Sequence, residues 1–422
     1  MKANEPQRAI LATIQVGTDL LADIRSERSL TELESLASEC NIETVGTIIQ
    51  KREAPDRSYW LGKGKLEEMA EMAAVLDADI LIFDTELSPT QVRRIEDLVS
   101  MEIVDRSLII FEIFARRAKT DEGKIQVELA QLRYRLTRLT GRGEELSRLG
   151  GGIGTRGPGE TQLETDRRHI MRRISLLRRE MEKISTRRSR TREQRSTREI
   201  ATVAVVGYTN SGKSTIVNTL CDADIEAENR LFMTLDPTAR RLVTKQGLSL
   251  ILIDTVGFIR DLPRYLLDAF AATLEEVSEA DYIMQVTDIS DPDYEQQIMI
   301  VEQQLLKLGS ASKPRLHVLN KIDQAMDDNW KVLLHQKQDR DQKTIAASAI
   351  EGTGMAEVRE ALCALAERNA VEFSVVISYE EAGLVNYIQE RGVIDELAYN
   401  EEGIFVRGRI PVSMSGPLKS YL

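Results

Sequence analysis

The chain has 422 residues, of which 42% are hydrophobic and ten are proline, and its formal net charge is −12. This length exceeds what one hydrophobic core supports, so we expect a soluble protein of two to four domains. No apolar run approaches the ~18 residues that a membrane span needs, and the N-terminus lacks the apolar region of a secretory signal. The three cysteines are far apart and lack CxxC spacing, which argues against zinc and disulfides and predicts a cytoplasmic protein.

Residues 1–115 alternate short apolar runs with amphipathic segments. This pattern predicts a small α/β domain with strands at 12–17, 44–50 and 78–84 and helices at 29–40, 65–76 and 89–100. The stretch "WLGKGKLEE" places two glycines and two lysines before a helix. An anion site at that helix N-terminus is one interpretation, and a plain turn that starts the helix is the other.

The next segment, residues 116–198, is strongly basic. Residues 133–198 hold 19 Arg and Lys against 8 Asp and Glu, a net charge of +11, so the rest of the chain carries −23. A solvated helical face rich in i,i+4 ion pairs is the common meaning of such charge. Here too few acids are present to pair with the arginines, which favours an RNA-directed surface.

Two heptad patterns carry this charge. Apolar residues step by four and three before and after the glycine-rich stretch 150–159, at Ile125, Leu129, Leu132, Leu136 and Leu139, and at Ile170, Ile174, Leu177, Met181 and Ile184. Such seams predict a long antiparallel helical hairpin with the glycine-rich stretch at its tip. Thr161 and Glu164 have capping-box spacing, which predicts that the second helix starts just beyond Pro158 and Gly159. A flexible linker is the alternative for the glycine-rich stretch.

The segment 199–367 contains the most specific motif. "ATVAVVGYTNSGKST" is a β-branched strand that runs into Gly207-x4-Gly212-Lys213-Ser214 and then a helical segment, the context that a P-loop requires. Backbone N–H groups of this loop surround phosphates, Lys213 reaches the β and γ oxygens, and the Ser214 hydroxyl faces Mg²⁺. The P-loop residues predicted to bind nucleotide are Gly207, Tyr208, Thr209, Asn210, Ser211, Gly212, Lys213, Ser214 and Thr215.

Three later motifs turn this P-loop domain into a predicted GTPase. "DTVG" begins with Asp254, which can hold the Mg²⁺ shell, and ends with Gly257, whose N–H can sense the γ-phosphate. "NKID" ends with Asp323, whose carboxylate can accept the paired N–H donors of guanine, and the backbone of Ser348 and Ala349 can meet guanine O6. The further residues predicted to bind GTP are Phe232, Met233, Thr234, Leu235, Asp236, Thr255, Val256, Asn320, Lys321, Ile322 and Ile350.

The catalytic group predicted from these motifs comprises Lys213, Thr234 and Gly257, with Ser214 and Thr234 as the Mg²⁺ ligands. Thr238 is the rival of Thr234 as the switch threonine. Many GTPases place a glutamine after the DxxG glycine to orient water, but this chain has Phe258 there, so we expect slow hydrolysis without a partner. Asn210 suggests a K⁺ ion in the site, and a hydrogen bond within the loop is the equal alternative.

The last segment, residues 368–422, reads as a small α+β domain. It begins with the apolar run 371–378, continues through a predicted helix at 380–392 and ends in a strand at 403–411. One interpretation is that this domain simply caps the GTPase domain.

From end to end, these residues resemble the HflX family of GTPases. The resemblance rests on "GKGKLEE", "FDTELSPTQ", "GGIGTRGPGETQLETDRR", "GYTNSGKST", "LFMTLDPT", "DTVGF" and "NKID", and it is weaker over the last fifty or so residues. Ser211, Met233 and the stretch "VRRIED" depart from the usual family pattern. The resemblance implies a P-loop GTPase domain preceded by a small α/β domain and a long helical hairpin and followed by a small α+β domain.

The resemblance also implies a function. HflX proteins bind the large (50S) ribosomal subunit, and with GTP they split stalled or idle 70S ribosomes, notably under stress. The implied partners are therefore 23S-type rRNA, ribosomal proteins and GTP or GDP, for a chain expected to be a monomer. With such partners, contact with a ribosomal protein of the stalk base is the equal alternative to the capping role of residues 368–422. Contacts with rRNA are expected at Arg148, Gly151, Gly152, Thr155, Arg156, Arg167 and Arg168.

Three questions stay open at this point. The resemblance implies an additional ATPase activity, for which "WLGKGK" is the candidate region. An rRNA chaperone or large-subunit assembly factor without splitting activity uses the same motifs, as does a protein-directed signalling GTPase. The last of these predicts no stimulation by RNA and weak dependence of turnover on salt.

Overall fold

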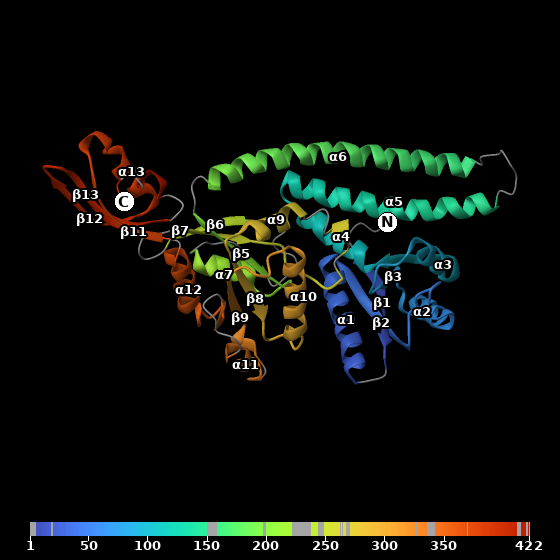
Figure 1. Ribbon diagram of the computed structural model, residues 1–422. Helices are drawn as coiled ribbons and strands as arrows, with labels where there is room; N and C mark the ends of the chain where they lie inside the picture. The colour runs from blue at the N-terminus through green and yellow to red at the C-terminus, as the bar shows by residue number, and fades with distance from the viewer. Residues whose placement is uncertain are drawn as a thin grey trace. The chain divides into compact units, whose positions relative to one another are not determined.

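The computed structural model describes residues 6–17, 20–149, 158–196, 200–221, 238–243, 249–261, 263, 265–266, 271–325, 327–335, 342–368, 370–411, 415–418 and 421. The chain divides into two compact units, one built mainly on residues 1–183 and the other mainly on the chain beyond them. The elements of both are labelled in Figure 1. We describe each unit by itself.

The first unit begins with a parallel four-stranded sheet in the order β2-β1-β3-β4. The elements in chain order are β1 (Gln7–Val16), α1 (Leu20–Glu39), β2 (Ile42–Arg52), α2 (Lys63–Leu76), β3 (Ile80–Phe83), α3 (Pro89–Val99), β4 (Glu102–Asp105) and α4 (Arg106–Arg117). The α/β prediction for this part is confirmed, although α1 begins at Leu20 rather than at residue 29. The sequence analysis did not predict β4 and α4, because the strand is short and runs directly into its helix without a Gly or Pro between them.

Alternating side chains divide the core of this sheet into two faces. Ile10 and Phe83 pack with residues of α2 and α3 in one cluster. Leu11 and Ile82, which occupy the alternate positions on the same strands, are also fully buried, and α1 packs against β1 and β2. A sheet buried on both faces is the usual form of a parallel α/β layer, and it explains the nearly continuous apolar runs of these strands.

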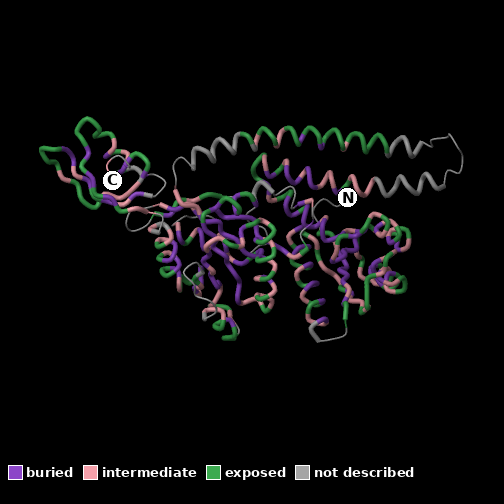
Figure 2. The backbone as a smooth tube through the Cα atoms, in the orientation of Figure 1, coloured by how far each residue is buried: buried purple, intermediate pink, exposed green. Residues whose placement is uncertain are grey.

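Two long helices follow, α5 (Asp121–Leu149) and α6 (Pro158–Ser196), and they run side by side in Figure 1. Leu129 of α5 is buried against Ile174 and Leu177 of α6, and the flanking members of both heptad rows pack around them. The predicted antiparallel hairpin is therefore confirmed. At ~1.5 Å per residue, the 29 residues of α5 span about 43 Å. The described part of α6 is mostly exposed away from this seam (Figure 2).

The predicted start of the second arm needs a correction. The helix α6 begins at Pro158, so Thr161 lies inside the helix and not at its N-cap. Proline is favoured in the first turn of a helix because its missing N–H would have no partner there and its φ is already helical. The glycine-rich residues 150–157 lie outside the described residues.

The second unit contains a six-stranded sheet in the order β10-β9-β8-β5-β7-β6, in which only β6 is antiparallel to its neighbour. Its elements are β5 (Ala201–Gly207), α7 (Lys213–Leu220), β6 (Thr238–Val243), β7 (Ser249–Asp254), α9 (Ala271–Glu279), β8 (Tyr282–Asp288), α10 (Tyr294–Lys307), β9 (Arg315–Asn320), η1 (Ile322–Gln324), α11 (Lys331–His335), β10 (Gln342–Ala346) and α12 (Met355–Arg368). The chain leaves β5 at the centre of the sheet, where the direction of winding reverses. Ligands bind at this point in open α/β sheets.

The chain ends in a three-stranded antiparallel sheet, β11-β13-β12, with one helix. The elements are β11 (Ala370–Ile377), η2 (Tyr379–Glu381), α13 (Gly383–Arg391), β12 (Val393–Asn400), β13 (Gly403–Pro411) and η4 (Gly416–Leu418). The helix packs its buried Val385 and Ile388 into the same cluster as the strands. The predicted α+β fold is confirmed, with β12 as an addition. The bounds of the four domains predicted from the sequence stay predictions.

Candidate GTP site

The P-loop connects the central strand β5 to α7. A Cβ atom on Gly207 would lie 2.2 Å from the carbonyl oxygen of Val286 in the neighbouring strand β8, so only glycine fits there. Gly212 has φ +88°, a left-handed conformation, and a Cβ on it would lie 2.2 Å from the side-chain nitrogen of Asn320. The two motif glycines are thus required by the packing around the loop.

Lys213, the first residue of α7, is held inside this loop. Its Nζ donates hydrogen bonds to the carbonyl oxygens of Tyr208 at 2.7 Å and Gly207 at 3.3 Å. Burial lowers the pKa of Lys213 to about 8, and the carboxylate of Asp254 opposes this shift. The ammonium group is therefore positioned before any nucleotide arrives, and its charge is sensitive to pH.

Ser214 and Asp254 come together beside Lys213. The Ser214 hydroxyl donates a 2.7 Å hydrogen bond to the carboxylate of Asp254 at the end of β7. A hydroxyl and a carboxylate at this distance are hard oxygen donors of the kind that Mg²⁺ prefers. This pair fits the metal that the sequence predicted.

The DTVG turn packs tightly onto the P-loop. A Cβ on Gly257 would lie 2.9 Å from both Lys213 Nζ and Thr209 Cα, so glycine is needed here. Phe258 donates its N–H to the carbonyl of Gly207 at 3.0 Å and accepts the N–H of Thr209 at 2.7 Å. The Phe258 side chain is buried. The two motifs form one backbone-bonded unit, and an apolar ring at this position cannot orient a water molecule.

Asn320 links the P-loop to the motif that follows β9. Its side chain donates to the carbonyl of Ser211 at 2.9 Å and accepts the N–H of Ala349 at 3.1 Å. Lys321, at φ +63°, forms a 2.6 Å ion pair with Asp288. Two residues on, Asp323 is exposed within η1. Loops predicted to contact phosphate and guanine are thus joined through one amide side chain.

The remaining predicted residues fall into three groups. Ser348 and Ala349 are buried after β10, whereas the side chain of Ile350 is exposed. Val256 is buried, and Thr255 donates its hydroxyl to the carbonyl of Val205 at 2.7 Å. Those outside the described residues are Phe232, Met233, Thr234, Leu235 and Asp236. Their rival Thr238 begins β6, opposite Asp254 in the strand register.

Three family models match consecutive parts of the chain. They are described as "GTP-binding GTPase N-terminal" over residues 27–115, "GTP-binding GTPase Middle Region" over 117–195 and "50S ribosome-binding GTPase" over 202–321. A GTPase HflX from Caldanaerobacter subterraneus subsp. tengcongensis is 42% identical, covering 100% of this chain and 95% of its own length. The chain belongs to the HflX family of GTPases.

Two other HflX relatives also match over nearly their whole length. The GTPase HflX of Lacrimispora saccharolytica is 43% identical, with 98% of this chain and 95% of its own length covered. The Escherichia coli K12 protein of that name is 36% identical, with 96% and 94% covered. Because the similarity extends over almost the whole chain, the α/β region and the hairpin are parts of the HflX architecture, and the predicted GTP-hydrolysing enzyme is confirmed.

In this HflX GTPase, three of the seven predicted RNA-contacting residues lie in the described helices of the hairpin. Arg167 and Arg168 are exposed on α6, and Arg148 lies near the end of α5. Gly151, Gly152, Thr155 and Arg156 lie outside the described residues. No helix in the described ranges combines the length and the hydropathy of a membrane span.

The "WLGKGK" segment of this HflX GTPase has the geometry of a turn that starts a helix. Gly62 is the N-cap of α2, and its N–H donates to the side-chain oxygen of Gln50 at 2.7 Å. The next lysine, Lys63, lies over the ring of Tyr59 at 5.8 Å. The arrangement favours the plain turn over an anion site. ATP hydrolysis by this region stays a prediction.

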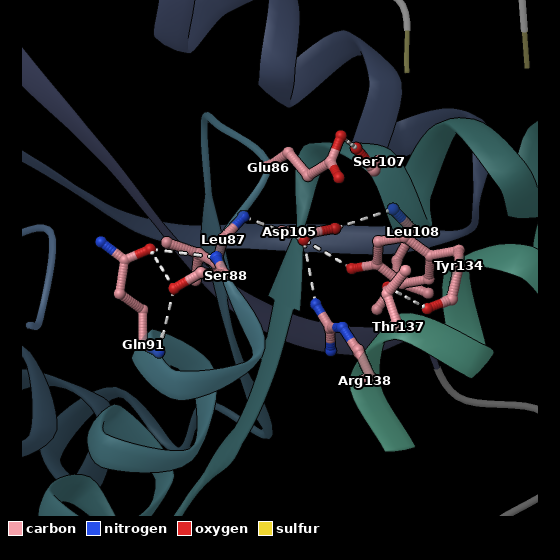
Figure 3. Close-up of polar contacts among 10 residues, drawn as sticks. All are labelled: Glu86, Leu87, Ser88, Gln91, Asp105, Ser107, Leu108, Tyr134, Thr137 and Arg138. Carbon is pink, nitrogen blue, oxygen red and sulfur yellow. Dashed lines mark hydrogen bonds and ion pairs between the residues drawn. The ribbon is translucent and has the colours of Figure 1, made fainter. Parts of the chain in front are cut away.

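A cluster that the sequence analysis missed joins the HflX α/β region to its hairpin (Figure 3). Asp105, at the end of β4, is completely buried and accepts hydrogen bonds from Leu108 N–H, Leu87 N–H, Tyr134 hydroxyl and Arg138 Nη2. Burial raises the pKa of Tyr134, and the Asp105 carboxylate adds to this effect. An aspartate before an apolar helix signals an N-cap, but no local pattern indicates the partners on α5.

Proposed function

We propose that this GTPase binds the large (50S) ribosomal subunit and splits stalled or idle 70S ribosomes when GTP is bound. Stimulation by the ribosome then accelerates hydrolysis and releases the factor. The observation that carries the proposal is the cationic helical hairpin, within a chain whose residues 202–321 match the family model described as a 50S ribosome-binding GTPase. We also propose that the protein is located in the cytoplasm and that it is a monomer.

The outer face of α6 supports an RNA partner. Arg168, Arg172 and Arg179 are exposed and lie opposite the seam residues at a helical period of 3.6. No carboxylate of the described chain pairs with these three side chains, whereas Arg173 forms a bidentate pair with Glu128 at 2.7 and 2.8 Å. Unpaired arginines favour phosphate contacts over the solvated, ion-paired face considered from the sequence.

We assign the nucleotide to the loops at the end of β5, β7 and β9. The backbone N–H groups of residues 207–215 cradle the phosphates, and Lys213 neutralises them. Gly257 N–H senses the γ-phosphate, and the carboxylate of Asp323 selects guanine. The backbone at Ser348 and Ala349 completes the base site. These roles agree with the fixed positions of Lys213, Gly257 and Asn320 described above.

We place Mg²⁺ at Ser214 and Thr234, with Asp254 behind them. When bound, the ion neutralises charge on the β and γ phosphates. A K⁺ ion at Asn210 is the second part of this proposal. Asn210 is exposed at φ +61° within the P-loop, and the Phe258 side chain, which follows Gly257, is apolar and buried. Equal GTP turnover in K⁺ and Na⁺ buffers would exclude the K⁺ role.

Sedimentation tests the splitting activity. Purified 70S ribosomes are mixed with the protein and a non-hydrolysable GTP analogue, next to a variant whose 150–159 segment is shortened. We expect the intact protein to convert 70S into 30S and 50S and the shortened variant to bind without splitting. Intrinsic GTP turnover of both proteins serves as the control for the GTPase fold.

A different result favours the second candidate function. If the protein sediments with 50S while 70S ribosomes stay whole, the splitting proposal fails. That result would favour a role as an rRNA chaperone or assembly factor. If neither ribosomes nor rRNA alter GTP turnover, the protein-directed signalling role gains instead.

A further inference from the structure

The first unit contains a cavity of about 540 Å³ between α3 and the two arms of the hairpin. Pro89 and Val92 of α3, Leu139 of α5 and Ile170 of α6 supply its apolar lining. This volume lies within the range of small-ligand sites, and it suits one aromatic group with its attached polar parts. No residue assigned to the GTP site lines this cavity.

One wall of the cavity is a fixed guanidinium group. Arg138 Nη2 donates to the buried Asp105 at 2.9 Å, and the guanidinium lies over the Tyr134 ring at 4.6 Å (Figure 3). The Nε of Arg138 is buried and donates to no acceptor in the described chain. A guanidinium group that two partners already hold in place loses little conformational entropy when a ligand contacts it.

The charge that this cavity offers to a ligand comes from Arg135. Arg93, Arg135 and Arg138 line the cavity together with His169, Glu96 and Asp166. Arg93 pairs with Asp97 and Arg138 with Asp105, whereas Arg135 is exposed and has no ion-pair partner among the described residues. An apolar space beside an unpaired arginine suits a nucleotide, with its base against apolar side chains and its phosphate on a guanidinium group.

The cations continue beyond the cavity along α6. Arg168 precedes His169 and Arg172 lies one turn after it, and both are exposed. A free nucleotide would leave these charges unused, whereas a strand has phosphates on both sides of the bound base. We propose that the cavity takes one unpaired nucleotide of an RNA strand. This inference rests on the RNA-directed function proposed above and names the form of RNA that it recognises.

Binding of two RNA probes tests the inference. The full chain, saturated with GDP so that the P-loop is occupied, is titrated with a ten-nucleotide single-stranded RNA and with the same strand annealed to its complement. Two variants alter the cavity: Arg135→Ala removes its charge, and Thr90→Trp fills it without removing a charge, because the exposed Thr90 at the start of α3 is part of the lining. We expect each variant to weaken binding of the single strand by about tenfold and binding of the duplex by less than about twofold. The control Arg172→Ala lies outside the cavity and should weaken both probes equally.

The possible outcomes distinguish a failure of the nucleotide assignment from a failure of the proposed RNA-directed function. Equal losses on both probes in the two cavity variants, or no loss on either, would overturn the nucleotide assignment while leaving RNA binding intact. Displacement of the single strand by micromolar adenosine or uridine monophosphate would identify a free nucleotide as the occupant. Displacement by a glutamate-rich peptide would assign the cavity to an acidic protein segment. A parent protein that binds neither probe would contradict the proposed RNA-directed function itself.

Discussion

At the scale of single residues, the first unit depends on a buried cation. Arg106 is 1% exposed and contacts Asp84 at 2.8 Å and Glu32 at 2.6 Å. Asp84 also accepts hydrogen bonds from the hydroxyl groups of Thr13 and Ser29. Two carboxylates from different elements converge on one guanidinium, so the charges are compensated only while all three side chains are in place.

Removing the cation should therefore destabilise the fold. We expect Arg106→Ala to lower the free energy of unfolding of the first unit by about 3–5 kcal/mol, because it leaves the buried Asp84 carboxylate and the partly buried Glu32 carboxylate without their shared cation. Urea unfolding followed by circular dichroism measures this loss. Arg116→Ala, which breaks an exposed pair with Glu112, should change the same quantity by less than about 1 kcal/mol. Equal effects of the two substitutions would contradict the argument.

Lys213 predicts a pH dependence of nucleotide binding. The pKa of Lys213 is about 8 in the free protein. The side chain therefore carries its ammonium charge, which the phosphates need, at pH values well below 8 and loses that charge as the pH rises through 8. GTP affinity should therefore be flat up to neutral pH and fall by about tenfold between pH 7 and pH 9. Fluorescence titration with a labelled GTP analogue measures it. Lys213→Arg keeps its charge throughout, so this variant reports every other effect of pH and should lack the fall.

At the scale of elements, the hairpin depends on its apolar seam. The described part of α6 buries its apolar residues Ile174 and Leu177 against α5, and a long helix with such a polar surface is marginal alone. Adjacent leucines on α6 separate the seam from the solvent face, since Leu177 is 1% exposed and Leu176 is 49% exposed.

This pair of leucines provides a matched test. Leu177→Ala should destabilise the packed arms by about 2–4 kcal/mol, because it opens a cavity in the seam. Leu176→Ala should have almost no effect, since its side chain is already in water. Amide hydrogen exchange across α5 and α6 measures the difference. Similar exchange in the two variants would show that the arms are not held together through this seam.

At the scale of the whole molecule, charge is divided between a basic hairpin segment and an acidic remainder. Residues 133–198 carry +11 and the other residues −23. The acidic remainder repels a polyanion, so nucleic acid should meet the protein only through the basic segment.

This division predicts a steep dependence of ribosome binding on salt. If roughly four phosphates are contacted, affinity for 50S subunits should fall by about a hundredfold between 50 and 200 mM KCl at constant Mg²⁺. Co-sedimentation across this range gives the slope. Binding of GTP to the protein alone should change far less, and a shallow slope for 50S would argue against an RNA-directed hairpin.

The features that the sequence predicted are those encoded locally. Gly207, Lys213 and Ser214 lie within eight residues of one another, and the heptad rows of α5 and α6 repeat along one helix face each. Such periods and short motifs are set by backbone geometry and by the immediate neighbours of each residue. The P-loop, the hairpin and the α/β class could therefore be predicted, whereas the exact start of α6 depended on a choice between two nearby capping signals.

Tertiary structure alone decided the contacts between distant segments. Arg106 meets Glu32 across 74 positions, Asp105 meets Arg138 across 33, and Asn320 reaches the carbonyl of Ser211 across 109. No period or motif specifies these pairs, because they exist only when packed helices and strands bring the side chains together. The same reason explains the cavity beside Arg138. The walls of this cavity come from three helices, so the sequence of any single helix does not indicate it.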